Sequence, residues 1–168
     1  MNTITHTERL AIRQLTLGDT DFIIELLNSP GWLKFIGDRN VHNIEDAINY
    51  LTNGPLKSYA ENGFGLYLVV TKADDTPIGM CGVLKRATLD HPDIGYALLP
   101  AFAGMGYAYE MANAVLKHAL HDLKLPVICA ITLPGNTASV KLLGKLGLQN
   151  KGPFVAEDSK ETLLLFQN

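Results

Sequence analysis

The stretch Ala97-Leu-Leu-Pro-Ala-Phe-Ala-Gly-Met-Gly-Tyr-Ala-Tyr-Glu110 carries the most structural information in this chain. It leaves a strand-like run, crosses Gly104 and Gly106, and enters an amphipathic helical pattern. Glycines let backbone N–H groups approach an anion without interference from a Cβ atom, and a helix N-terminus adds unpaired amides and the positive end of its dipole. The stretch therefore predicts a main-chain cradle for a phosphate-bearing ligand.

Two common nucleotide motifs do not fit this turn. The dinucleotide fingerprint needs a third glycine where Tyr109 stands, and it opens a βαβ unit instead of following several antiparallel-looking strands. A P-loop needs a lysine followed by serine or threonine after the second glycine, and the sequence has none there. A glycine pair can also serve only to turn a strand tightly into a helix, so the wider pattern has to decide.

Hydrophobic patterning predicts strands and helices on both sides of the turn, without internal repeats or linkers. A capping box over 16–19 and an N-capping Asn43 predict two helices before it. Asn136 is expected to begin a later helix that Gly147 ends. A long helix runs from the turn to before Pro126, breaks or loosening are expected at 29–31 and 54–55, and strands are expected at 10–15, 65–71, 77–84, 93–99, 127–133 and 162–166.

The composition predicts one domain spanning residues 1–168, with a core over about 7–167, because 168 residues with 47% hydrophobic content suit a single core. A net charge of −3 without basic runs argues against nucleic acid as a partner. The sequence has neither a basic leader with an apolar run nor ~20 consecutive apolar residues, so we expect a cytoplasmic protein without membrane contact. Cys81 and Cys129 lie in apolar runs and are expected to be buried and reduced.

The order of strand, glycine turn, helix, apolar strand, Pro-x-Asn and a helix ending at 145–148 resembles the GNAT superfamily of acyl-CoA-dependent N-acetyltransferases. In that family the phosphate loop reads Gln/Arg-x-x-Gly-x-Gly/Ala, and residues 103–108 match it except at Ala103. The stretches 7–13, 93–96 and 136–139 resemble the branch that acetylates ribosomal-protein N-termini. The resemblance covers nearly the whole chain. It implies a mixed α/β (α+β) fold with a mostly antiparallel, centrally splayed sheet flanked by helices.

The resemblance also implies acetyl-CoA as the donor. A splayed strand at 97–99, with Leu98 and Leu99 as cofactor-binding residues, would pair with the pantetheine arm, and a backbone N–H there, that of Leu98, would bond the thioester oxygen. Asn136 would both cap its helix and bond pantetheine. The pyrophosphate would rest on the amides of the turn, which are those of Gly104, Met105, Gly106, Tyr107 and Ala108.

Two side chains are candidates for proton transfer. Asp93 begins the strand that leads to the turn, where related enzymes often carry a carboxylate, and it is the candidate proton acceptor. Many family members place an acidic tyrosine in the helix after Asn136, but Leu143 stands at that place, so Ser139 is the candidate that serves the leaving thiolate. Both also have structural readings: a solvated carboxylate at a strand end, and a small polar residue in the first turn of a capped helix.

We expect the acceptor to be the α-amine of a protein or peptide N-terminus, because a weak carboxylate base suits an amine of pKa ~8 better than a lysine of ~10.4. A polyamine or aminoglycoside acceptor and a non-catalytic acyl-CoA-binding module remain the alternatives. Trp32, Phe35 and Tyr50 are candidates for either the acceptor pocket or the core. His118 and His121 have no completing ligands in the sequence pattern, so no metal is expected, and the assembly state stays open between monomer and homodimer.

Overall fold

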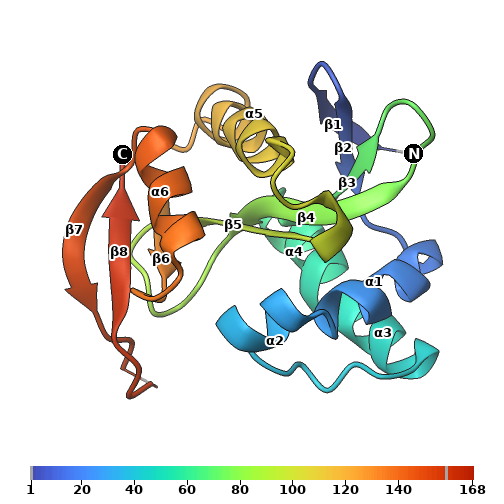
Figure 1. The fold of residues 1–168 in the computed structure, drawn as a ribbon, viewed down its shortest axis with the longest axis horizontal. Helices are drawn as coiled ribbons and strands as arrows, with labels where there is room; N and C mark the ends of the chain where they lie inside the picture. Colours follow the sequence, from blue (N-terminus) through green and yellow to red (C-terminus); the bar gives the residue numbers. More distant parts are fainter. Residues whose placement is uncertain (1, 158) are drawn as a thin grey trace.

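The computed structural model describes residues 2–157 and 159–168. Figure 1 shows a single open sheet with helices on both faces. Its strands run in the order β1-β2-β3-β4-β5-β6-β8-β7, and every neighbouring pair is antiparallel except β5 and β6. The strands are β1 (Thr3–His6), β2 (Leu10–Gln14), β3 (Leu66–Thr71), β4 (Pro77–Leu84), β5 (Asp93–Leu98), β6 (Cys129–Thr132), β7 (Gln149–Phe154) and β8 (Leu163–Gln167). The α-helices are α1 (Thr20–Leu27), α2 (Pro30–Phe35), α3 (Ile44–Leu51), α4 (Lys57–Asn62), α5 (Tyr107–His121) and α6 (Thr137–Lys145).

The two faces of the sheet support two hydrophobic clusters. Side chains alternate along a strand, so Tyr67 and Val69 of β3 pack with α5 and α6, whereas Leu68 and Val70 pack with α1, α2 and α3. The mixed α/β fold expected from the sequence is therefore confirmed.

The predicted helix ends are confirmed where a side chain makes them. Thr16 and Asp19 form the capping box before α1, and Asn43 accepts the N–H of Asp46 at the start of α3. Pro55 does not interrupt the helical path. After α3 the backbone continues through a π-helical turn, Thr52–Leu56, into α4. The wider turn accommodates a residue that has no N–H to donate.

Three elements differ from the sequence prediction. The expected break at 29–31 is present but covers only residues 28 and 29, because Pro30 occupies the first position of α2, where its missing N–H costs nothing, and α2 itself was not predicted as a helix. β1 and β7 were not predicted from the sequence. Both are edge strands in which few residues are buried, so they lack the apolar alternation that marks an interior strand.

The sheet divides between β5 and β6. A single registered residue pair, Asp93 and Cys129, joins these parallel strands, supported by a hydrogen bond from the Cys129 N–H to the Pro92 carbonyl (2.8 Å). In contrast, β5 stays paired with β4 from Asp93 as far as Leu98. The strands thus form a wedge whose closed end is at Asp93 and whose open end faces the glycine turn. The predicted central splay is confirmed.

Candidate functional site

The glycine turn lies at the open end of the wedge and leads directly into α5. Gly104 (φ +77°) and Gly106 (φ +82°) both adopt the left-handed conformation, which L side chains rarely occupy. Gly106 is the N-cap of α5, and no side chain in the described residues caps this end. The N–H of Glu110 bonds back to the Gly106 carbonyl (3.1 Å), so the amides that precede it, including those of Tyr107 and Ala108, have no partner within the helix.

Arg9 supports this turn from the segment between β1 and β2. Its Nη1 donates to the Met105 carbonyl (3.0 Å), its guanidinium lies over the Tyr107 ring (4.3 Å to the centroid), and its Nε donates to Glu110 (2.7 Å). Glu110 also accepts hydrogen bonds from the Thr7 hydroxyl and the Arg9 N–H. Burial alone would raise the pKa of Glu110, but these donors outweigh it and hold the pKa below its usual range.

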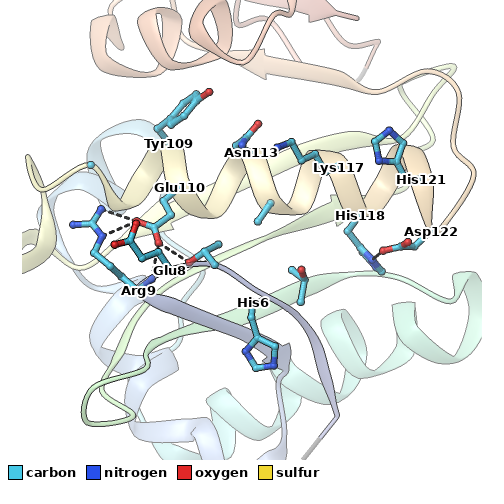
Figure 2. A pocket seen from close by; sticks show the side chains of 14 residues that line it. His6, Glu8, Arg9, Tyr109, Glu110, Asn113, Lys117, His118, His121 and Asp122 are labelled. Atoms are coloured by element: carbon cyan, nitrogen blue, oxygen red, sulfur yellow. Dashed lines mark hydrogen bonds and ion pairs between the residues drawn. The ribbon is translucent and has the colours of Figure 1, made fainter.

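The Arg9–Glu110 pair was not predicted, because no sequence pattern relates two residues that lie about a hundred positions apart. Figure 2 shows this pair at one end of a cavity of about 570 Å³ between α5 and the β1–β2 segment. The ion pair of His118 with Asp122 (2.7 Å) lies at the other end. The glycine turn is therefore fixed by a tertiary ion pair, although Ala103 supplies no polar side chain.

Backbone groups of β5 alternate between the two sides of the strand. The N–H of Leu99 donates to Ile78 of β4 (2.8 Å), so the backbone groups of residues 93, 95, 97 and 99 point toward β4. Those of Tyr96 and Leu98 consequently point into the wedge. The predicted Leu98 N–H is free to face a ligand there. The N–H of Leu99, the other residue predicted to bind the cofactor at this place, is used within the sheet, so a contact of Leu99 with the cofactor would need another of its atoms.

Ser139 reaches the wedge from the first turn of α6. Its N–H donates to the Asn136 side chain (3.2 Å), which confirms the predicted N-cap. Its hydroxyl is hydrogen-bonded to the hydroxyl of Tyr96 (2.7 Å), a contact that joins α6 to β5 across the open part of the wedge. Burial raises the pKa of Tyr96 to about 12, although the bond from Ser139 acts in the opposite direction. This tyrosine is a further polar group beside Ser139 that sequence spacing did not single out.

Asp93 lies at the closed end of the wedge and is only 1% exposed. It is therefore not the solvated strand-end carboxylate that was one reading of the sequence. Its carboxylate accepts from Arg86 Nε, at 3.0 Å to one oxygen and 3.1 Å to the other. Burial raises the pKa of Asp93, and the positive charge and hydrogen bond of Arg86 only partly offset this effect. Arg86 was not predicted, since it lies in a loop without any periodic pattern.

Asp93 and Ser139 lie on opposite faces of β5. Ile94 and Tyr96 pack with the α5 and α6 cluster, so the alternating Asp93, Gly95 and Ala97 face the helices α1–α4. The same face carries Leu84, the cross-strand partner of Asp93. Any reaction that uses both side chains must therefore take place in the opening between β5 and β6.

A hollow of about 330 Å³ adjoins the Asp93 face of the sheet. It lies between this face and the π-helical turn and α4, and we call it the α4 groove. Its lining includes Tyr50, Leu66, Leu84, Lys85, Lys57 and Glu61. Tyr50 therefore lines the α4 groove. Trp32 belongs to the core instead, and its buried indole N–H has no hydrogen-bond partner in the described part of the chain.

Other candidate groups lie apart from the wedge or are buried. Cys81 and Cys129 are free and buried, as expected, and burial raises the pKa of each thiol. In residues 2–157 and 159–168, no cluster of three or more His, Cys, Asp or Glu side chains is arranged to hold a metal ion. Within the same residues, no helix is long and apolar enough to cross a membrane.

The chain matches known proteins over most of its length. The family model of the acetyltransferase (GNAT) domain matches residues 9–149. An uncharacterized N-acetyltransferase of Bacillus licheniformis, p20, is 28% identical over 151 residues, which are 88% of this chain and 83% of that protein.

Solved structures share the fold at lower identity. RimL, a ribosomal alpha-N-protein acetyltransferase solved in complex with coenzyme A, has a TM-score of 0.84 at 14% identity, covering 99% of this chain and 97% of that one. A spermidine N-acetyltransferase chimera of Vibrio cholerae SpeG and hSSAT has a TM-score of 0.75 at 18% identity, covering 94% and 93%. The names of these neighbours thus include both a protein and a polyamine acceptor.

Proposed function

Because the chain belongs to the GNAT family of N-acetyltransferases, we propose that it transfers the acetyl group of acetyl-CoA to the α-amine of a protein or peptide N-terminus. The observation that carries this proposal is the wedge, which has backbone donors along one strand, a glycine turn at its open end and a buried carboxylate at its closed end. Its shape suits a long donor with an anionic end and a reactive end.

The residues of the wedge fit acetyl-CoA. Gly104 and Gly106 leave space where a side chain would stand, since a Cβ on Gly104 meets nothing within 4 Å and one on Gly106 meets only Arg9 Nη2 at 3.4 Å. The backbone of residues 104–108 would hold the pyrophosphate at the N-terminus of α5. The backbone of β5 that faces the wedge and the Asn136 side chain would hold the pantetheine arm. These assignments extend the predicted phosphate loop into the wedge.

The side chains supply the proton transfers. Bound acetyl-CoA provides the thioester, whose carbonyl carbon forms the new C–N bond as its C–S bond breaks. Asp93 accepts the first proton of the acceptor ammonium, because its raised pKa makes it a better base than an exposed aspartate. Ser139, oriented by Tyr96, relays the second amine proton to the departing sulfur. The Leu98 N–H stabilises negative charge on the thioester oxygen.

The pKa of the acceptor favours an α-amine. At pH 7 an α-amine of pKa ~8 is about one-tenth neutral, whereas a lysine of pKa ~10.4 is neutral in roughly one molecule in a few thousand. A single carboxylate that is paired with Arg86 is a modest base. It therefore needs an acceptor that loses its proton easily.

Coenzyme A release, followed with a free-thiol reagent, tests the proposal. Tetrapeptides with a free N-terminus should give acceptor-dependent release, and the same peptides with a blocked N-terminus are the matched control. Faster release with spermidine or an aminoglycoside would replace the proposed acceptor by a small amine. Tight coenzyme A binding without release for any amine would indicate an acyl-CoA-binding module.

A further inference from the structure

Arg86 holds Asp93 in an unequal ion pair. The Asp93 carboxylate is 1% exposed, whereas the Arg86 side chain is 39% exposed and belongs to the loop between β4 and β5. A single N–H, that of Nε, is shared between the two carboxylate oxygens at 3.0 and 3.1 Å. The fork of two parallel N–H bonds that arginine can form is therefore not used.

In residues 2–157 and 159–168, two other arginine–carboxylate pairs form, and both are held more firmly. Asp19 receives two separate Arg13 nitrogens, at 2.7 and 3.0 Å, together with the N–H and hydroxyl of Thr16. Glu110 receives Arg9 Nε and Nη2 at 2.7 and 2.6 Å as well as the donors from the β1–β2 segment. Among the described residues, Arg86 is the only side chain that donates to Asp93. The Arg86–Asp93 pair therefore has fewer and longer hydrogen bonds than the other two pairs, so its arginine is the easiest to displace.

We propose that Arg86 occupies the position of the acceptor ammonium, and that the acceptor binds by displacing the Arg86 guanidinium from Asp93. This inference rests on the proposed acetyl transfer and adds how the acceptor is selected. The exchange replaces one cation on a buried carboxylate by another, so the carboxylate is never left unpaired in the interior. Arg86 can leave because its side chain reaches solvent, whereas Asp93 is fixed at the closed end of the wedge.

The displaced arginine restricts which amines fit. Arg86 and its neighbour Lys85, which lines the α4 groove, carry two positive charges in the loop that leads to Asp93, and both remain in that loop after the exchange. A second cationic group on the acceptor would meet these charges, and the groove offers Glu61 only as the partner of Lys57 (3.8 Å). The site therefore favours an acceptor with one ammonium group, as in a neutral peptide, over a polyamine.

The exchange also changes the basicity of Asp93. Burial raises the pKa of this carboxyl, and Arg86 partly offsets that effect. The departure of Arg86 removes its part of the offset. Two other ionisable groups lie nearby, Cys129 on β6 and Asp90 in the loop before β5. Burial raises the pKa of the Cys129 thiol, and the negative charges of Asp93 and Asp90 raise it further. The acceptor ammonium that replaces Arg86 keeps a positive charge against the carboxylate until it passes its proton to Asp93, which burial then favours in the neutral form.

Arg86→Ala and Arg86→Gln test the exchange in steady-state acetylation with a neutral tetrapeptide and with spermidine. Both variants should have a KM for the tetrapeptide that is roughly two- to five-fold lower than that of the wild type. In the wild type, Arg86 occupies Asp93 in part of the molecules and so reduces the fraction that can bind the acceptor, and the variants lack this competition. The relative rate with spermidine should rise. The pH at which Asp93 limits kcat/KM should also move upward, which a purely structural role of Arg86 would not produce.

Controls separate this inference from the proposed function. Lys151→Ala removes an equal charge from the distant edge strand β7 and should leave KM unchanged. Calorimetry with the tetrapeptide and the protein saturated with coenzyme A gives the same comparison without turnover, and circular dichroism verifies that each variant is folded. Unchanged or raised KM in both folded variants overturns the exchange while wild-type acetylation stands. A wild type that acetylates no amine overturns the proposed function itself.

Discussion

Replacing Gly106 by alanine tests whether the left-handed turn before α5 is required. Gly106 has φ +82°, where an L side chain crowds the following carbonyl at a cost of about 1–2 kcal/mol. The added Cβ would meet only Arg9 Nη2 at 3.4 Å, an ordinary contact, so the backbone strain is the whole expected cost. For a domain of this size, about 2–4 °C per kcal/mol gives a Tm lowered by roughly 2–8 °C.

Gly144→Ala is the matched control. Gly144 lies within α6, its φ is not positive, and a Cβ there meets nothing within 4 Å. The same substitution should therefore stabilise the protein by about 0.5–1 kcal/mol, because alanine favours a helix interior over glycine. The two variants add the same methyl group and should shift Tm in opposite directions.

Calorimetric titration with coenzyme A measures the functional part of the effect. If the turn of the Gly106 variant relaxes to relieve strain, the ligand has to restore it, and affinity should fall by the same 1–2 kcal/mol, roughly five- to thirty-fold. Circular dichroism melts give Tm for both variants. A Gly106→Ala protein with the Tm and the coenzyme A affinity of the wild type would refute the argument that this conformation builds the cradle.

Three further predictions concern side chains around the wedge. Ser139→Ala should lower kcat more than Tyr96→Phe, which should lower it about ten-fold without changing KM for acetyl-CoA, because the phenol only orients the serine. Equal losses of kcat in steady-state kinetics would contradict this order. Glu110→Gln should weaken coenzyme A binding and lower Tm. The decrease in Tm should become smaller toward acidic pH, because a carboxyl with a lowered pKa contributes stability above its unfolded pKa and loses that contribution as pH falls through its folded pKa. Asp93→Asn should reduce kcat/KM about 10²- to 10⁴-fold, whereas stability at neutral pH should hold or rise. Because the pKa of this carboxyl is raised, the folded protein favours its neutral form and loses stability as pH rises through the folded pKa, a loss that asparagine avoids. A large drop in Tm by calorimetry would indicate a structural ion pair instead.

Local sequence signals predicted most of the fold, because they act over a few residues. Neighbouring side chains decide the capping box at Thr16 and the N-caps at Asn43 and Asn136, and the left-handed conformation open to glycine decides the turn that ends at Gly106. Interior strands such as β3 and β4 are almost entirely buried and have unmistakable apolar runs. Edge strands carry no such signal, which is why β1 and β7 were missed.

The candidate site could be predicted only in part from the sequence. Asp93 and Ser139 were recognised from their positions beside strands and helix ends, but their placement on opposite faces of β5 follows from strand register. Arg86 and Arg9 were missed because their partners are chosen by tertiary packing. Sequence spacing also did not show that the Leu99 N–H bonds to Ile78 within the sheet, because one step along a strand exchanges the two edges toward which its backbone groups point.

The wedge gives the sheet an internal edge in the middle of the molecule. Tyr96 and Leu98 present backbone groups there as an exposed edge strand does, and such edges are templates for unwanted strand pairing. A bound pantetheine arm would act as a substitute strand that covers this edge. Ligand occupancy should therefore slow amide exchange at these two positions and reduce self-association on heating, so that acetyl-CoA would serve as a folding ligand as well as a reactant.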